Sequence, residues 1–127
     1  MREKLEKLLQ NSYSPYSKFQ VAAIVVLNDG TEIRGVNVEN ASYGATICAE
    51  RSAIVSAVSK GYQKGDFKKL YVMVNSDKIS TCCFICRQVI AEFFSEDAEI
   101  VCMSQKEEKT FLVRDLCPNP FNEDDLK

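Results

Sequence analysis

The stretch FQVAAIVVLNDGTEIRGVN, residues 19–37, contains two apolar segments separated by a turn signal. Residues 19–27 are rich in Val, Ile and Ala, which is typical of a buried strand. Asn28-Asp29-Gly30 is a hairpin signal, because these residue types accept the positive φ angles of tight turns. Residues 31–37 then return as a second strand. The stretch therefore predicts a β-hairpin.

Helix and strand patterns alternate on either side of this hairpin. Leucines at helical spacing predict a short helix over residues 2–10, and residues 11–18 and 40–46 are predicted to be loops. Further patterns predict helices at 48–60 and 83–94, strands at 69–75 and 99–103, a short helix or turn at 110–116 and a frayed tail at 122–127. This order predicts an α/β fold, a three-layer α/β/α sandwich around a mixed sheet.

Length and charge narrow the class of protein. The 127 residues fit one domain, 1–127, with one core. The net charge of -2 gives no bulk attraction to nucleic acid, so we expect no nucleic-acid partner. No run of about 18 apolar residues occurs, so we expect no membrane partner. The charged N-terminus lacks an apolar signal core, and the expected location is cytoplasmic.

Cysteine usage points to a metal or a catalytic thiol. In a chain without a secretion signal, six cysteines favour metal or catalytic roles over disulfides. Histidine is absent, so a soft-metal site must use thiolates, with carboxylates as weaker candidates. The same absence excludes Ser-His and Cys-His nucleophilic mechanisms.

The strongest local signal combines Cys83-Phe-Ile-Cys86 with Cys48-Ala-Glu50. A Cys-x-x-Cys pair at a helix start lets two sulfurs converge on one ion. Taken alone, the pair also fits two buried cysteines or a redox couple. Cys48 lies at the predicted start of another helix, and helix starts gather at one edge of a layered α/β sheet. The combination therefore predicts three thiolates directed at one point, Cys48, Cys83 and Cys86.

Three protein ligands leave one tetrahedral position open, which is typical of catalytic zinc. Glu50 lies two residues after Cys48, within reach of that position without being a ligand. A carboxylate in a partly dry pocket beside an anionic cluster should have a raised pKa, which suits a general acid–base. Three thiolates make zinc a poorer Lewis acid, and Arg51 and Arg87 are candidates for the compensating positive charge.

These residues match a known sequence motif. Zinc deaminases carry a His-x-Glu or Cys-x-Glu motif followed by Pro-Cys-x-x-Cys. The chain has Cys48-Ala-Glu50-Arg51 and, 32 residues past Arg51, Cys83-Phe-Ile-Cys86-Arg-Gln. It resembles the small cytidine deaminases that use three cysteine ligands and act on free nucleosides. Residues 14–21 resemble the opening segment of that family, and residues 35–44 its nucleoside-binding segment.

The resemblance implies a role at each matched position. It implies Zn²⁺ as cofactor, a nucleoside as substrate and a homotetramer as the assembly. Asn37 and Glu39 would hydrogen-bond the ribose hydroxyls, and Phe19 would pack against the pyrimidine. Across a subunit boundary, Tyr43 and Phe121 would complete the site. A second shell of Arg51 and Gln88 would donate hydrogen bonds to the ligand sulfurs.

The implied reaction is hydrolytic deamination of cytidine or deoxycytidine to uridine or deoxyuridine. Glu50 would take a proton from zinc-bound water, and oxygen would add to ring carbon 4 of cytosine. Glu50 would then protonate ring nitrogen 3 and assist the departure of ammonia.

Two positions depart from the family pattern. Cys82 and Phe84 stand where Pro and Gly are usual, so Cys82 is a competing ligand and Phe84 is expected to narrow the site. Cys83 is favoured because it keeps the spacing to Cys86. Cys102 and Cys117 are expected to be buried apolar residues.

Three other interpretations stay open at this point. One is a deaminase of another cytosine compound, such as a nucleoside antibiotic. Another is a non-catalytic zinc module with Cys82, Cys102 or Cys117 as the fourth ligand. A third is a redox protein with a reversible Cys83–Cys86 disulfide.

Overall fold

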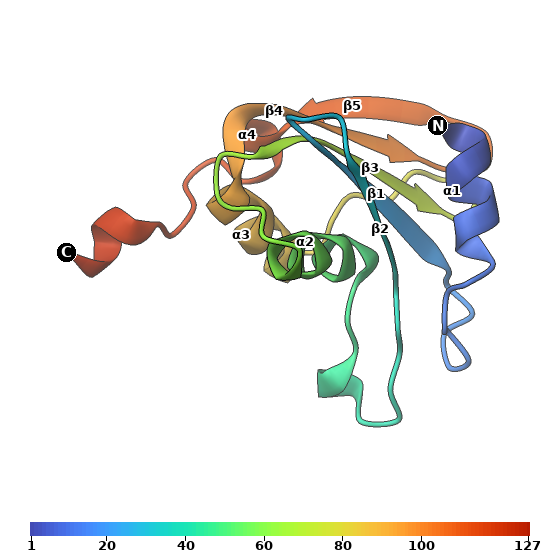
Figure 1. Ribbon diagram of the computed structural model, residues 1–127. Coiled ribbons are helices and arrows are strands. Elements are labelled where there is room, and N and C mark those ends of the chain that lie inside the picture. The colour runs from blue at the N-terminus through green and yellow to red at the C-terminus, as the bar shows by residue number, and fades with distance from the viewer.

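The computed structural model describes residues 1–127, which form one five-stranded sheet with helices packed on it. In chain order the elements are α1 (Arg2–Leu9), β1 (Val21–Leu27), β2 (Glu32–Val36), the 3₁₀ turn η1 (Tyr43–Ala45), α2 (Ala49–Ser59), β3 (Phe67–Val74), α3 (Phe84–Phe93), β4 (Phe94–Met103), β5 (Glu108–Leu112), α4 (Val113–Leu116) and the 3₁₀ turn η2 (Glu123–Leu126). Figure 1 shows this arrangement.

The sheet is mixed, with strand order β2-β1-β3-β4-β5. Antiparallel pairs join β1 to β2, β1 to β3 and β4 to β5, while β3 and β4 run parallel. The predicted hairpin forms β1 and β2, and Gly30 takes a φ of 88° in its turn. A parallel pair requires a crossover connection, which α3 supplies between β3 and β4.

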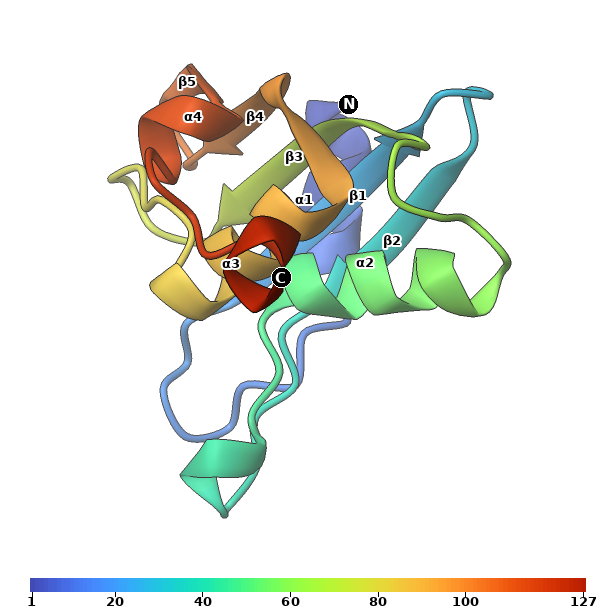
Figure 2. The same cartoon turned by 90° about the vertical axis from the view of Figure 1, so that its left-hand side faces the viewer.

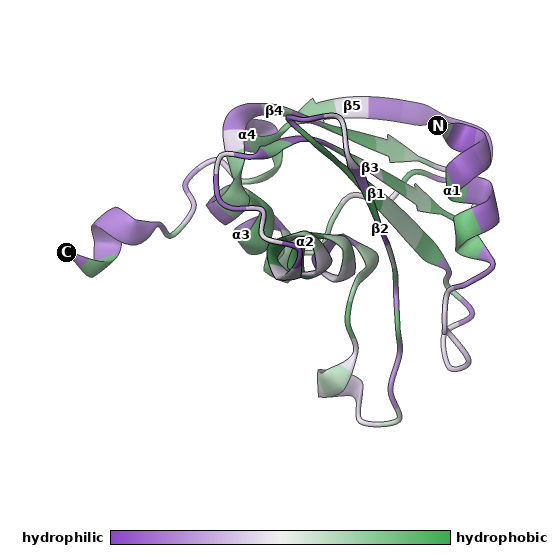
Figure 3. Ribbon diagram, in the orientation of Figure 1, coloured by the Kyte–Doolittle hydropathy of each residue, from purple (hydrophilic) through white to green (hydrophobic).

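Helices cover both faces of the sheet, so the predicted α/β/α layering is confirmed (Figures 1 and 2). Side chains of β1 alternate between the two faces, as a strand period of two requires. Ala22 and Ile24 join the smaller core cluster beneath α1, while Ala23 and Val25 join the larger cluster under α2 and α3. The central strands are strongly hydrophobic, whereas the C-terminal tail is hydrophilic (Figure 3).

A close backbone contact seats α2 on the sheet. A Cβ atom on Gly35 of β2 would lie 2.4 Å from the backbone nitrogen of Ala53 and 2.5 Å from the carbonyl oxygen of Ala49. Because those distances are far below van der Waals contact, only glycine lets β2 and α2 approach this closely. The contact fixes the height of the N-terminus of α2, where Cys48 and Glu50 lie.

Three local expectations need correction at the end of the chain. Residues 108–112 form the edge strand β5, so the helix or turn predicted for 110–116 is reduced to α4. Strand β4 begins at Phe94, immediately after α3, rather than at Glu99. The tail predicted to be frayed contains the exposed turn η2, in which Asn122 Oδ1 accepts a hydrogen bond from Asp124 N (2.9 Å).

Two segments extend away from the body of the chain in Figure 1. One is the connection from β2 to α2, which carries η1 and projects in Figure 2 as well, and the other is the C-terminal tail after α4, which lies in front of α3 in Figure 2. No helix has both the length and the apolar character that crossing a membrane requires.

Candidate active site

Three cysteine sulfurs converge where α2 and α3 begin. Cys48 is the N-cap residue of α2, Cys83 is the N-cap residue of α3, and Cys86 lies in the first turn of α3. Their sulfur atoms all lie within 4.8 Å of one another, and Cys48 Sγ is 3.7 Å from Cys83 Sγ. All three are free thiols. The predicted convergence is therefore present in the fold.

The local structure favours negative charge at this point. The first N–H groups of a helix lack backbone partners, and the helix dipole places partial positive charge there. Cys86 N donates a hydrogen bond to Cys83 Sγ (3.4 Å), and Arg51 Nη2 donates one to Cys48 Sγ (3.5 Å). Hydrogen bonds from Cys86 and then Arg51 lower the pKa of Cys48 to about 5. Cys48 is thus prepared to be a thiolate, whereas the hydrogen bond of Cys86 with Cys48 and then burial raise the pKa of the Cys86 thiol.

The donor set fits zinc. Thiolates are soft ligands suited to Zn²⁺, and three of them leave a tetrahedral ion one open position. No fourth Cys, Asp or Glu shares the cluster. The hydrogen bond from Arg51 Nη2 to Cys48 Sγ places the positive charge of this guanidinium beside the cluster, while Arg51 Nε is buried without a hydrogen-bond partner. A closed four-ligand structural site would need a donor that this arrangement lacks.

A cavity of about 260 Å³ opens beside Cys48 and Cys83. Apolar and polar groups line it from the start of β1, from the segment between β2 and α2, from β3, and from the starts of α2 and α3. They are Phe19, Val21, Asn37, Glu39, Thr46, Cys48, Ala49, Glu50, Val72, Val74, Ser80, Thr81 and Cys83. Concave, partly apolar cavities with a few convergent polar groups are typical of small-molecule sites.

Glu50 lies in this cavity wall and is only 4% exposed. Desolvation by burial raises the pKa of its carboxyl, because water no longer stabilises the charged form. It is not a member of the thiol cluster, although it lies two residues from Cys48. A buried carboxyl of raised pKa beside a metal-ligand cluster is suited to proton transfer.

The two residues predicted to bind ribose line the same cavity, but different groups hold their side chains in place. Asn37 is buried, and its amide bonds to the backbone at Val21 N (2.9 Å) and Phe19 O (2.8 Å). Glu39 Oε1 instead accepts hydrogen bonds from Tyr16 N (3.0 Å) and Ser17 N (3.1 Å). The Ser17 hydroxyl also donates to Glu39 and lowers the pKa of its carboxyl. Both polar groups are therefore oriented before any ligand arrives.

Other predicted residues lie outside the cavity of the single chain. Tyr43 is 78% exposed on the projecting segment, and its ring lies edge-on to the Tyr16 ring with 6.4 Å between the ring centroids. Phe121 is exposed on the C-terminal tail, where its carbonyl oxygen accepts a hydrogen bond from Gln88 Nε2 (2.7 Å). Gln88 thus contacts the tail, and the hydrogen bond expected from it to a ligand sulfur is absent from this chain.

Phe84 does not narrow the cavity, so that expectation is wrong. It is the first residue of α3, is 77% exposed, and lines a separate hollow with Phe121. The guanidinium of Arg87 lies over its ring at 4.4 Å. Arg87 donates to Cys82 O (2.7 Å) and Leu116 O (2.9 Å), so it fastens α3 to its surroundings instead of contacting the sulfurs.

Cys82 does not join the cluster. It is 3% exposed and belongs to the larger core, as does the fully buried Cys102. Its hydrogen bond with Cys102 and its burial raise the pKa of the Cys82 thiol, which keeps it neutral. Cys83 is therefore the member of the adjacent pair that faces the site. Cys117 was expected to be buried and is partly exposed.

Sequence patterns did not single out several lining residues. Val72 and Val74 were assigned only to a strand, while Ser80 and Thr81 lie in the connection before α3. Their position just before the cysteine pair was the one available signal. They line the cavity together with Val21 at the start of β1 and Val74 at the end of β3.

The described geometry can be compared with known proteins. The family model for the cytidine and deoxycytidylate deaminase zinc-binding region matches residues 1–104. This chain belongs to the cytidine deaminase family. Among relatives in this family, the cytidine deaminase of Sporosarcina psychrophila is 40% identical over 124 residues, covering 95% of this chain and 88% of the relative. The probable cytidine deaminase of Dictyostelium discoideum is 42% identical over 135 residues, covering 98% and 88%.

Solved structures of the family agree with the fold. Cytidine deaminase from Burkholderia pseudomallei superposes with a TM-score of 0.89 at 38% identity, covering 94% of each chain. The family match and the three-thiol cluster together identify Zn²⁺ as the cofactor of this cytidine deaminase family member. The predicted fold class is confirmed by the same agreement.

Proposed function

We propose that this chain catalyses zinc-dependent hydrolytic deamination of cytidine and deoxycytidine, in which water adds to the base and ammonia leaves. The observation that carries the proposal is the opening of one cavity onto Cys48, Cys83, Glu50, Asn37 and Glu39. That cavity places metal ligands, a buried acid and polar groups for a sugar around one small-molecule volume. The family relationship supports the same reaction.

In this proposal Cys48, Cys83 and Cys86 hold the zinc ion. Arg51 donates to Cys48 Sγ and offsets part of the negative charge of three thiolates. When bound, Zn²⁺ supplies a Lewis acid that makes water a nucleophile near neutral pH. Val72 and Val74 give the cavity an apolar wall.

Glu50 moves the protons. It accepts a proton from the attacking water as oxygen bonds to ring carbon 4 of cytosine, and it delivers that proton to ring nitrogen 3. A second transfer through the same carboxyl accompanies cleavage of the bond to the exocyclic nitrogen, which leaves as ammonia. Burial of Glu50 matches this role, since its raised pKa brings both protonation states within reach.

The sugar and base contacts complete the proposal. Asn37 keeps one amide N–H free for a ribose hydroxyl, and the Glu39 carboxylate accepts from another. Phe19, which lies at the cavity wall, packs against the pyrimidine. Cytidine is neutral, so recognition by a few oriented polar groups agrees with the low net charge of the chain.

Glu50→Gln tests the catalytic assignment. The amide fills the same space but cannot shuttle protons, so kcat for ammonia release from cytidine should fall about 10²–10⁴-fold. Zinc content should stay at the wild-type value, because Glu50 is not among the proposed ligands. Glu6→Gln, on the exposed face of α1, is the matched control with unchanged turnover. Near-normal turnover in Glu50→Gln would refute the role.

We also propose that residues 1–127 act as one domain in a cytoplasmic homotetramer. The two segments that project from the body carry the exposed aromatic rings of Tyr43 and Phe121. Ile85 and Val55 add exposed apolar surface on α3 and α2. Burial against further copies would cover these groups and bring the rings toward neighbouring cavities. Six free cysteines agree with a reducing compartment. Light scattering of the purified protein measures the assembly, and a monomeric mass would contradict it.

A further inference from the structure

The amide of Asn37 has almost no freedom left. Its Oδ1 accepts hydrogen bonds from Ser12 Oγ and from Val21 N, and its Nδ2 donates to Phe19 O. An amide oxygen has two acceptor positions and an amide nitrogen has two hydrogens. Both acceptor positions are filled and one hydrogen is used. The single remaining N–H is thus the only group of this buried side chain that a ligand in the cavity can use.

The direction of the Ser12 hydroxyl follows from its partners. Asn37 Oδ1 can only accept, so the Ser12 proton must point toward it. Ser14 Oγ lies 3.0 Å from Ser12 Oγ, so Ser14 must be the donor between the two hydroxyls. A directed chain of hydrogen bonds therefore runs from Ser14 through Ser12 to Asn37. Backbone bonds from Tyr13 N to Asn37 O (3.0 Å) and from Glu39 N to Tyr13 O (2.8 Å) fix the two segments side by side.

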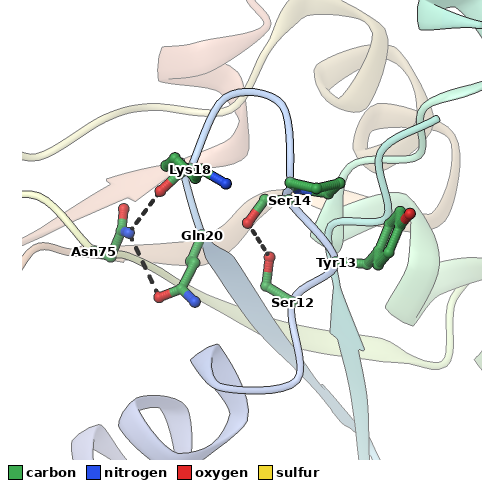
Figure 4. Close-up of a pocket in the computed structure, with 7 residues that line it drawn as sticks. Ser12, Tyr13, Ser14, Lys18, Gln20 and Asn75 are labelled. Atoms are coloured by element: carbon green, nitrogen blue, oxygen red, sulfur yellow. Dashed lines mark hydrogen bonds between the residues drawn. The ribbon is translucent and has the colours of Figure 1, made fainter. Parts of the chain in front are cut away.

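This chain of hydrogen bonds begins outside the cavity. Ser12 and Ser14 line a polar surface hollow with Lys18, Gln20 and Asn75, and Figure 4 shows the two hydroxyls turned toward each other. Neither serine lines the cavity that holds Glu50. Ser12 therefore acts on a ligand only through Asn37.

We infer that Ser12, supported by Ser14, is a positioning residue that fixes the Asn37 amide so that its free N–H points at a ribose hydroxyl oxygen. The inference rests on the proposed function for the identity of the ligand. Without the Ser12 donor, one acceptor position of Asn37 Oδ1 is left open in a buried place. Only the bonds with Val21 N and Phe19 O then hold the amide, so it moves more freely and its N–H faces the sugar for less of the time.

Ser12→Ala tests the inference in two ways. In ligand-free ¹H–¹⁵N spectra, the Asn37 side-chain amide signals should shift and broaden, while those of Asn75 should not. An unchanged Asn37 signal would overturn the inference whatever the enzyme does with cytidine. Ser12→Thr keeps the hydroxyl and should retain the wild-type Asn37 signals. Gln20→Ala, which changes another residue of the same hollow, should also leave the Asn37 signals in place.

The kinetic arm compares cytidine with 2′,3′-dideoxycytidine, which lacks both ribose hydroxyls. A contact made equally in the ground and transition states sets KM rather than kcat. Ser12→Ala should raise KM for cytidine about three- to tenfold with kcat within about twofold, and Ser14→Ala should raise it less. With the dideoxy substrate, the Ser12→Ala effect on KM should vanish.

Failure of the inference about Ser12 and failure of the proposed function would give different experimental results. An equal KM rise for both substrates would mean that Ser12 supports the fold in general, and no rise for cytidine would mean that Asn37 is fixed without it; either result overturns the inference. If wild-type protein with full zinc released no ammonia from either compound, the proposed function would fail while the amide signals still reported on Ser12.

Discussion

Cys82 and Cys83 are neighbours in the sequence, yet they belong to two different thiol regions. Cys83 lines the cavity with Cys48, and both cluster with the buried Cys86, where an N–H donor and Arg51 contact the sulfurs. Cys82 lies in the core with Cys102, where its hydrogen bond with Cys102 and then burial raise the pKa of the Cys82 thiol and keep it neutral. We call the first set the thiol cluster and the second the core thiol pair.

The comparison shows that surroundings, not residue type, decide what a cysteine does. Successive residues just before a helix point in different directions, so one thiol enters the cavity and the other enters the core. Positive charge and access to solvent suit the first to metal ligation. Apolar neighbours make the second a small hydrophobic residue. Substitutions that act on one region and not on the other test this distinction.

The largest effect is expected from Cys83→Ala set against Cys102→Ala. Cys83→Ala should weaken zinc binding by more than about 100-fold, since even residues behind the ligands are worth about 10–100-fold. Ammonia release should be lost with the metal. Cys102→Ala should keep a full complement of zinc and lower the free energy of unfolding by about 1 kcal/mol, as an average point mutation does. Metal analysis and chemical denaturation measure both.

Two outcomes would break the comparison. Full zinc in purified Cys83→Ala would mean that Cys82 can serve as a ligand after all. Loss of zinc in Cys102→Ala would place the core thiol pair within the metal site.

A smaller effect is expected from Arg51→Gln set against Arg87→Gln. Arg51 donates to Cys48 Sγ, so Arg51→Gln should lower zinc affinity about 10–100-fold in chelator competition. Arg87 donates to Cys82 O and Leu116 O, so Arg87→Gln should lower Tm while zinc affinity changes less. Equal losses of affinity would mean that the two arginines act on the cluster alike.

The smallest effect on the metal is expected from Gly35→Ala, which disturbs the support of only one thiol in the cluster. The added Cβ would meet backbone atoms of α2, so the helix that follows Cys48 must shift. Overpacking of this kind typically costs about 1–3 kcal/mol of unfolding free energy. Gly44→Ala is the control, because a Cβ there meets nothing within 4 Å. Denaturation that left the two variants equally stable would contradict the close packing.

Some parts of the fold could be predicted because they depend on local patterns. The hairpin followed from Asn28-Asp29-Gly30 between apolar runs, and α2 and α3 followed from helical spacing. Strand β5 could not be predicted, because Glu108, Lys109 and Thr110 lack an apolar alternation. They form a strand only because the free edge of β4 offers backbone partners from Met103 to Glu99.

The candidate site likewise contains residues that local sequence patterns predicted and residues that they did not. The spacing of Cys83 and Cys86 gave two ligand candidates on one helix start, and the Cys48-Ala-Glu50 unit gave the third with its acid. Phe84 was misjudged because the motif does not tell which way the first side chain of a helix points. Ser12 was missed because a serine in a loop carries no signal until the fold brings it to Asn37.

The amino-acid sequence by itself determined the chemistry available to this protein: thiolates instead of imidazoles, one acid beside the first cysteine, and a helix start for each ligand group. Tertiary structure alone decided which of two adjacent thiols joins the thiol cluster, which arginine contacts sulfur, and which serine contacts Asn37. The reason is physical. Residue type and local spacing set charge and secondary structure, whereas burial, direction and hydrogen-bond partners arise only when segments distant in sequence pack against one another.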